Sequence, residues 1–384
     1  MDFELPGHTK QIKALVRQLV ERYAMPMEER FLRGETITED ERKEATRAAA
    51  EVGLWGLALS KELGGADLST LDNVAVAEEN NRTLFPIQFG GNAPFLEACK
   101  GEQRGKYLMP VLRGEKRMAF ALTEPSGGSD PGNMMQTRAV KDGDDWVING
   151  SKVFITGADV ADFVLVVAIT DPERRQHGGV TAFLVDRGTP GFQVVRQIPI
   201  MRAARHDSWV GPCELLFDNC RVPASQVLGT VGMGFRLAQR GLSTARMNIG
   251  AQCVGIASRC YDMMVAYAKE RVLFGEPIAA KQAVQAMIVD SYIDIHTTRL
   301  VTYDAAWKND QGLDTRVESG MVKLIGSEMV ARVVDRAIQI HGGYGVTTEL
   351  PFAHWYNRIR PMRVYEGPTE VQKFQILARA LLHR

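Results

Sequence analysis

The sequence predicts an α+β protein in which a segment of short β-strands lies between two helical segments. Helical patterns fill the first third of the chain, β-rich runs separated by turn residues follow, and helical periodicity returns from about Gly232. With 384 residues and 45% hydrophobic side chains, the chain is long enough for two or three packing units with large apolar cores. The changes of pattern predict three domains, at residues 1–117, 118–228 and 229–384.

The first predicted domain is helical. Thr38 and Glu41 have the spacing of a capping box, and an alanine-rich amphipathic run follows them as far as Leu54. Further helical patterns cover residues 71–81 and 95–112.

The second predicted domain is an antiparallel β domain. Its β-rich runs are separated by clusters of Gly, Pro, Asp and Asn, which is typical of strands joined by turns. In chain order the runs are MAFAL, WVI, KVFIT, FVLVVAI, VTAFLV, GFQVV and CELLF.

The third predicted domain is again helical. Spacings of three and four residues indicate one buried helix face, which carries Cys253, Ile256, Cys260, Met263 and Tyr267. Thr315 and Glu318 form a second candidate capping box, and the long helical run behind them is expected to stop at Gly342.

Composition excludes several kinds of partner. The chain has 46 basic and 46 acidic residues, so its balanced charge gives no reason to expect nucleic acid or an anionic membrane as a partner. No signal peptide and no apolar run of about 18 residues is visible, and we expect a reduced, cytoplasmic protein without membrane insertion. The seven histidines show no HxxH or HExxH spacing and the five cysteines no CxxC pair, so no metal site is predicted.

Five short segments carry residue types that suit a flat cofactor or a phosphate, although each alone has an ordinary structural interpretation. The loop from Phe120 to Asp130 is rich in Gly, Ser and Thr, so backbone N–H groups and hydroxyls can approach a phosphate. Phe154 and Thr156 fall on one face of a predicted strand, where a core aromatic and an edge threonine are the simpler interpretation. The other three segments are residues 271–275 followed by Gln282, residues 339–345, and residues 363–372 around Glu366.

Taken together and in this order, the five segments resemble the acyl-CoA dehydrogenase family of flavoproteins. The motifs that carry the resemblance run along nearly the whole chain and are ALTEPSGGSD, NGSKVFIT, ERVLFG, QIHGGYG and YEG. The resemblance implies a helical N-terminal domain, a middle antiparallel β domain and a C-terminal four-helix bundle. It also implies FAD as cofactor, an acyl-CoA substrate, an electron-transfer flavoprotein as electron acceptor, and a homodimer or homotetramer.

The resemblance also implies two groups of FAD contacts. The first group belongs to the middle domain, with Thr156 near the flavin N5 edge, and is Phe120, Leu122, Thr123, Gly128, Ser129, Phe154 and Thr156. The second group would contact the FAD of a neighbouring subunit, and is Arg271, Phe274, Gln282, Gln339, Gly342 and Gly343. An arginine suits a pyrophosphate because its planar fork donates two hydrogen bonds. In this family the cofactor site would therefore be shared across a dimer interface.

Glu366 matches the family's catalytic base, which would abstract the α-proton of the acyl group while the β-hydrogen leaves as hydride to the flavin. Burial should raise its pKa from about 4.3 toward roughly 6–7, closer to a working pH. Its backbone N–H and a flavin ribityl hydroxyl would polarise the thioester carbonyl. A minority of the family has its base at the position of Ala245, and alanine cannot accept a proton. Residues implied to contact the substrate are Ser129, Ser243, Arg246, Tyr365 and Gly367.

The chain departs from the family pattern at several positions. Leu273 replaces a frequent hydroxyl residue near the flavin phosphates, and Pro368 and Glu370 replace the frequent Thr/Ser and Gln among the adenosine contacts. Residues 201–217, with His206 and Trp209, form a longer segment than usual. That segment either reshapes the mouth of the site or is a harmless loop extension.

Two other classes of function stay open on the sequence. A flavin oxidase or monooxygenase of the same fold is disfavoured, because the oxidases usually carry a further helical domain where only residues 367–384 follow Glu366, and the monooxygenases generally lack the carboxylate. A non-catalytic CoA-binding homologue is disfavoured by the intact base and the nearly complete FAD set. Acyl chain length and branching are not fixed by any spacing in the sequence.

Overall fold

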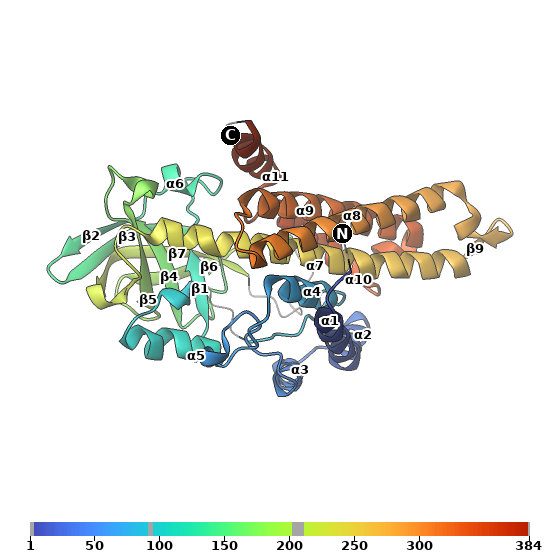
Figure 1. Ribbon diagram of the computed structural model, residues 1–384, viewed down its shortest axis with the longest axis horizontal. Helices are drawn as coiled ribbons and strands as arrows, with labels where there is room; N and C mark the ends of the chain where they lie inside the picture. The colour runs from blue at the N-terminus through green and yellow to red at the C-terminus, as the bar shows by residue number, and fades with distance from the viewer. Residues whose placement is uncertain (1–3, 91–94, 202–210, 383–384) are drawn as a thin grey trace. The chain divides into compact units, whose positions relative to one another are not determined.

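The computed structural model describes residues 4–90, 95–201 and 211–382. These residues form two compact units, each described here by itself. The helical unit takes in the described residues up to Phe89, Met201, and those from Ser243 onward, and the β unit takes in those of 90–200 and 209–242. Helix, strand and helix follow one another along the chain, which confirms the predicted α+β class (Figure 1).

The N-terminal helices of the helical unit are α1 (Gly7–Leu19), α2 (Met25–Leu32), α3 (Glu39–Glu51) and α4 (Thr70–Asn80). The predicted capping box is confirmed, because the Thr38 side chain accepts a hydrogen bond from the Glu41 N–H and the Glu41 carboxylate accepts one from the Thr38 N–H. Helix α4 also confirms the predicted helix at residues 71–81, and it begins with Ser69 as its side-chain cap.

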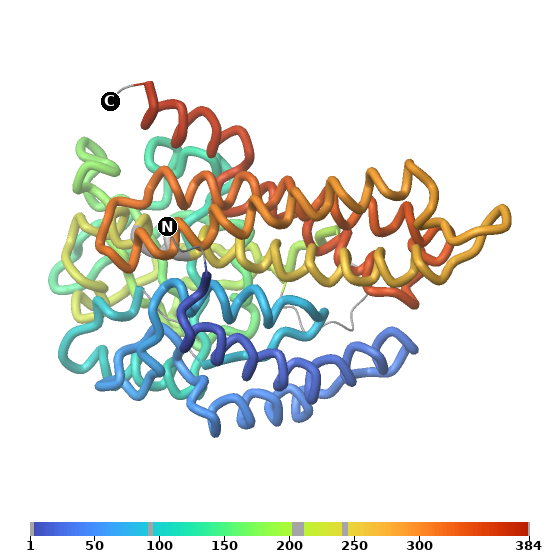
Figure 2. The backbone as a smooth tube through the Cα atoms, turned by 45° about the vertical axis from the view of Figure 1, so that its right-hand side comes forward, coloured from blue at the N-terminus to red at the C-terminus, as the bar shows by residue number. Residues whose placement is uncertain are grey.

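The C-terminal part of the helical unit contains three long helices and several short ones. Its elements are α7 (Gly234–Glu270, in this unit from Ser243), the hairpin β9 (Val272–Leu273) and β10 (Glu276–Pro277), α8 (Gln282–Asp310), α9 (Arg316–His341), α10 (Pro351–Ile359), α11 (Thr369–Val371) and α12 (Ala378–Leu382). Helices α8 and α9 lie side by side (Figures 1 and 2), and α10 and the helical turn η10 (Gln372–Leu377) pack against α9.

The core of the helical unit combines residues that are distant in the sequence. Ile256, Ala257 and Cys260 of α7 belong to the same buried cluster as Val330 and Val333 of α9. The predicted face of α7 is therefore the one it buries. No helix in the described part of the chain combines the length and hydropathy needed to cross a membrane.

The β unit is built on one sheet. Its strands are β1 (Met118–Ala121), β2 (Arg138–Asp142), β3 (Asp145–Thr156), β4 (Phe163–Ile169), β5 (Val180–Asp186), β6 (Phe192–Gln197), β7 (Pro212–Pro223) and β8 (Val227–Leu228). Within the described residues the order is β6-β7-β3-β2-β4-β5-β8, with β1 also paired to β4. Most pairs are antiparallel, as predicted, while β1 and β2 pair with β4 in parallel. Every residue of β4 is buried, which explains its continuous apolar run.

Two local predictions are wrong. The expected helix at residues 95–112 is broken into η3 (Leu96–Ala98), η4 (Arg104–Leu108) and α5 (Met109–Leu112), because Cys99 is extended and Gly101 has a φ of +50°. Thr315 does not cap α9 with its side chain. Its hydroxyl instead donates to Asn309 Oδ1 at 3.5 Å, so the capping-box spacing there is a coincidence of sequence.

Candidate active site

Glu366 lies in a tight loop between η9 (Arg360–Arg363) and α11, and its backbone is in the left-handed region. Its φ is +55°, and that of Gly367 is +92°. A non-glycine residue rarely adopts a positive φ, and such residues concentrate at functional sites where the surrounding structure holds them in place. The backbone conformation alone therefore separates Glu366 from an ordinary surface turn.

Three buried or half-buried donors hold the backbone carbonyls of this loop. Gln372 Nε2 donates to Glu366 O at 2.8 Å and to Gly367 O at 3.1 Å. Lys323 Nζ donates to Gly367 O at 2.6 Å, and Arg246 Nε donates to Glu366 O at 3.2 Å. Lys323 and Gln372 are completely buried. A Cβ on Gly367 would lie 2.5 Å from Gln372 Nε2, so this position requires glycine.

The carboxyl group of Glu366 is placed to accept a proton. Its Oε2 atom is buried and makes no hydrogen bond within the described structure. Burial raises the pKa of Glu366 above its ordinary value, and the positive charges of Arg246 and Lys323 oppose that rise. A desolvated carboxylate with a free oxygen is a stronger base than one in water.

Arg246 and Tyr365, both predicted to contact the substrate, lie beside Glu366. Arg246 is half-buried on α7, and burial lowers its pKa. Tyr365 packs against the core of the helical unit, and burial raises the pKa of its phenol. Ser243 lies in α7, but its side chain is outside the part of the structure that is described.

The middle-domain group of predicted contacts begins where β1 ends. Phe120 stacks on Phe95 with ring centroids 4.5 Å apart, and Leu122 is buried while Thr123 is half-buried. Gly128 and Ser129 are exposed in the loop that follows. This arrangement leaves the Gly/Ser segment open to a ligand while its start is anchored in the sheet.

A buried ion pair beneath this loop was not predicted. Lys152 on β3 is fully buried, and its Nζ donates to Leu122 O at 2.9 Å and to Glu124 Oε1 at 2.8 Å. The Glu124 carboxylate also accepts from the backbone N–H groups of Gln136 and Thr137. Burial lowers the pKa of Lys152 to about 8, and Glu124 opposes that fall. A lysine inside the predicted strand KVFIT was the only sequence signal for this pair.

Phe154 and Thr156 are both exposed, so the simpler interpretation of Phe154 as a core aromatic is wrong. The pairing of β3 with β7 shifts between Lys152 and Ile155, which marks a bulge. Phe154 within it has a φ of +60° and is 58% exposed, while Ile155 points into the core and Thr156 is exposed. A bulge re-aims side chains, and here it leaves an aromatic ring and a hydroxyl exposed on the surface of the β unit.

The second group of predicted contacts gathers at one end of the helical unit. The Tyr267 and His341 rings stack with centroids 4.4 Å apart, so the end of α9 lies against the last turns of α7. Six exposed residues lie near the end of α7, the start of α8 or the end of α9. They are Arg271, Phe274, Gln282, Gln339, Gly342 and Gly343. No described carboxylate pairs with Arg271, which suits a residue that binds an external anion.

The remaining predicted contacts are less informative. Pro368 is half-buried at the start of α11, and Glu370 is exposed on it. Leu273, in the hairpin strand β9, is exposed without a hydroxyl to offer. His206 and Trp209 belong to residues 202–210, which lie outside the described part of the chain.

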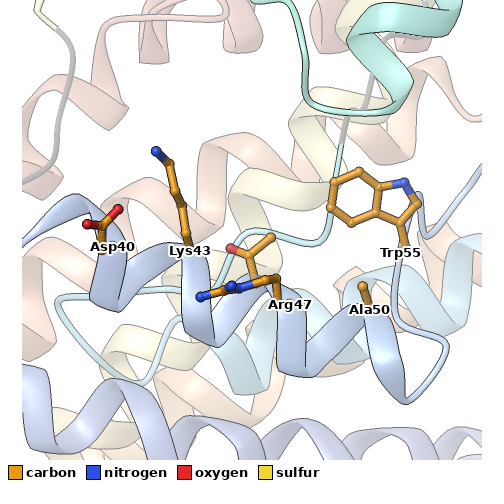
Figure 3. Close-up of a pocket in the computed structure, with 6 residues that line it drawn as sticks. Asp40, Lys43, Arg47, Ala50 and Trp55 are labelled. Atoms are coloured by element: carbon orange, nitrogen blue, oxygen red, sulfur yellow. The ribbon is translucent and has the colours of Figure 1, made fainter.

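The structure also contains two open cavities that hold none of the predicted site residues. One, of about 620 Å³, follows a single face of α3 (Figure 3) and is lined by Asp40, Lys43, Thr46, Arg47, Ala50 and Trp55. The other, of about 490 Å³, is lined by Asn133, Met134, Met135, Gln136, Arg138 and Arg175. Among the described residues no cluster of His, Cys, Asp and Glu side chains has the geometry of a metal site.

Three family models match the chain in succession. They describe the N-terminal, middle and C-terminal domains of acyl-CoA dehydrogenases and match residues 7–115, 119–220 and 232–382. The chain is 34% identical to (R)-benzylsuccinyl-CoA dehydrogenase of Thauera aromatica, with 99% of this chain and 97% of that protein covered. It is 34% identical to acryloyl-CoA reductase (NADH) of Anaerotignum propionicum, with 100% and 97% covered. A solved structure described as the FAD complex of PigA is 29% identical and superposes with a TM-score of 0.88 over 99% of both chains.

Proposed function

Because the chain belongs to the acyl-CoA dehydrogenase family, we propose that it is an FAD-dependent enzyme that introduces a double bond between the α- and β-carbons of an acyl-CoA thioester. The observation that carries the proposal is the state of Glu366. Its Oε2 atom is buried and unbonded in a half-buried side chain, on a backbone that three donors hold in a left-handed conformation. A residue with only a structural role would not need this arrangement.

In the proposed reaction Glu366 accepts the α-proton and becomes a neutral carboxylic acid. FAD, when bound, supplies the two-electron acceptor for the hydride that leaves the β-carbon. The proton and the hydride together account for the two hydrogens removed, and the electrons of the broken α-C–H bond form the double bond. Desolvation of Glu366 favours its protonated form, so the same burial that raises its pKa drives the proton transfer.

The residues available to hold FAD fit a flat ring and a pyrophosphate. Phe154 and Thr156 offer an exposed ring and hydroxyl on one face of β3, and Gly128 and Ser129 offer an open loop. Arg271 offers an exposed guanidinium that no described carboxylate neutralises. We assign the first four residues to the FAD of their own subunit and Arg271 to that of a neighbour, as the family resemblance implies.

A second subunit is supported by the apolar surface around Arg271. Exposed apolar side chains lie at this end of the helical unit, namely Val272, Leu273, Phe274, Tyr344 and Val346. Phe274 is 93% exposed, although aromatic side chains of this size are usually covered. We propose that a homodimer or homotetramer covers these residues, and that an electron-transfer flavoprotein reoxidises the enzyme.

The opposite direction of the reaction is the second candidate. One relative that matches the full chain at 34% identity is an acryloyl-CoA reductase (NADH). In that direction Glu366 would donate the proton instead of accepting it. Its raised pKa suits either role, because burial favours the protonated acid that donates and makes the carboxylate a stronger acceptor.

An anaerobic titration tests the proposal. The FAD-loaded protein is mixed with saturated acyl-CoA esters that differ in chain length, branching and aromatic or carboxylate substituents, and its visible spectrum is recorded. Bleaching of the flavin band by one ester supports oxidation and defines the acyl class. The reductive alternative instead requires that chemically reduced protein be reoxidised by an enoyl-CoA. If neither reaction occurs with any ester, the proposed function is wrong.

A further inference from the structure

Lys323 is a buried cation that the proposed reaction does not yet use. It lies on α9 and is fully buried, and its Nζ donates to Gly367 O at 2.6 Å. No carboxylate forms an ion pair with it in the described part of the chain. An unpaired buried ammonium is costly, so a neutral side chain of similar length would serve the core better. The position of Lys323 therefore calls for an explanation other than packing.

Among the charged groups near Lys323, the Glu366 carboxyl group is the one that its positive charge can stabilise. The titratable groups whose charges act on Lys323 are Arg246 and Cys253 of α7, Glu328 of α9 itself, and Glu366. Glu328 is already engaged, because it accepts hydrogen bonds from Arg363 Nε at 2.9 Å and from the Thr369 hydroxyl at 2.7 Å. The Cys253 thiol is neutral, since burial raises its pKa to about 12. Glu366 therefore differs from Glu328, because no positively charged side chain forms an ion pair with the Glu366 carboxylate in the described residues.

We propose that Lys323 is a positioning residue for the base, which pins the Gly367 carbonyl and, through its positive charge, keeps the Glu366 carboxylate ready to accept a proton. The inference rests on the proposed function, because it assumes that Glu366 is the base. Two influences on Glu366 oppose each other. Burial raises its pKa, and the charges of Arg246 and Lys323 lower it. Burial alone favours the protonated form of Glu366, which cannot accept a proton.

The chain offers a matched pair of variants that separates charge from hydrogen bonding. Lys323→Met and Gln372→Met each remove a donor from the Gly367 carbonyl, and both side chains are fully buried. Only Lys323→Met also removes a positive charge. Lys323→Gln, which keeps a donor but not the charge, replaces Lys323→Met if the latter does not fold.

The first measurement is an infrared titration of the FAD-loaded proteins. The carboxylic acid band of Glu366 is identified as the band that Glu366→Gln lacks, and its pKa is followed in each variant. We expect Lys323→Met to raise this pKa by about one unit or more. At a pH below both pKa values, the ionised fraction of Glu366 then falls about tenfold. Gln372→Met should leave the pKa within about 0.3 units of the parent value while it lowers turnover. An unchanged pKa in Lys323→Met would overturn the proposal.

The second measurement is the pH dependence of kcat/KM with the acyl-CoA ester that bleaches the flavin. The ascending limb of Lys323→Met should move to higher pH, so that raising the pH restores part of its activity. A uniform loss at every pH would show a structural role only and would also overturn the proposal. If no ester reacts with the parent protein, the proposed function fails, but the infrared titration still decides the role of Lys323.

Discussion

At the scale of single residues, Glu366 combines a strained backbone with a desolvated side chain, and each has a measurable consequence. Replacement of Glu366 by Gln keeps the shape of the side chain but removes its ability to accept a proton. We expect turnover to fall by about 10²–10⁴-fold while FAD stays bound, since a positioned general base contributes about that factor. Stopped-flow bleaching of the flavin band measures this. Turnover within tenfold of the parent would exclude Glu366 as the base.

The same substitution should change how stability depends on pH. The pKa of Glu366 is raised in the folded protein, so folding favours the protonated form and the folded state binds more protons than the unfolded one. Stability from this group is therefore present below its ordinary pKa and is lost as pH rises through the folded value. Glu366→Gln cannot ionise, and its melting temperature should exceed that of the parent near neutral pH but match it at acidic pH. Parallel thermal melts across that range test the sign.

Gly367 provides a separate test of the loop backbone. Gly367→Ala adds a Cβ at a φ of +92° and 2.5 Å from Gln372 Nε2. We expect a loss of stability of about 1–3 kcal/mol, together with a loss of turnover because Glu366 is displaced. Gly312→Ala is the control, since its φ is +71° but nothing lies within 4 Å of the added atom. If the two variants lose the same stability in urea and the same turnover, the contact with Gln372 is unimportant.

At the scale of elements, the loop after β1 depends on the ion pair between Lys152 and Glu124. Lys152→Met leaves the Glu124 carboxylate buried without its cation, which we expect to cost about 3–5 kcal/mol. Lys106→Met is a matched control in the same unit, because the Lys106–Asp186 pair is partly exposed and such pairs contribute little. Urea denaturation measures both. The deficit of Lys152→Met should narrow as pH falls and Glu124 takes up a proton. Equal losses in the two variants would show that burial of the pair is irrelevant.

The elements were largely predictable, but the contacts that complete the site were not. The capping box at Thr38 and the buried face of α7 follow from local spacing, which a sequence displays directly. The bond from Lys323 to Gly367 joins residues 44 apart, and that from Lys152 to Glu124 joins residues 28 apart. Periodicity shows which positions are buried, but not which donor meets which carbonyl. The sequence held one signal for Lys323. It lies seven residues before Val330, on the same buried face of α9, where an ionisable side chain is unusual.

At the scale of the whole molecule, the proposed FAD contacts divide between two subunits. Glu366 and Arg271 both belong to the helical unit of one chain. In the proposed arrangement, Glu366 acts in the active site of its own subunit, while Arg271 contacts the FAD of the neighbouring subunit. Arg271→Ala is expected to lose FAD on dialysis, because the guanidinium would bind the pyrophosphate of the neighbour's cofactor. Arg316→Ala is the control, since Arg316 is an exposed arginine already paired with Asp314. Equal flavin retention by the two variants would contradict the assignment of Arg271.

Mixed oligomers of two inactive variants test the shared site directly. In a dimer of one Arg271→Ala chain and one Glu366→Gln chain, a shared architecture puts both substitutions in one site and leaves the other site intact. Random pairing makes half of the dimers mixed, so a co-expressed sample should recover about a quarter of the parental activity after dialysis without added FAD. If each chain instead builds a complete site alone, every site carries one defect and no activity returns. Separately purified variants, mixed without exchange of subunits, provide the baseline against which the recovery is measured.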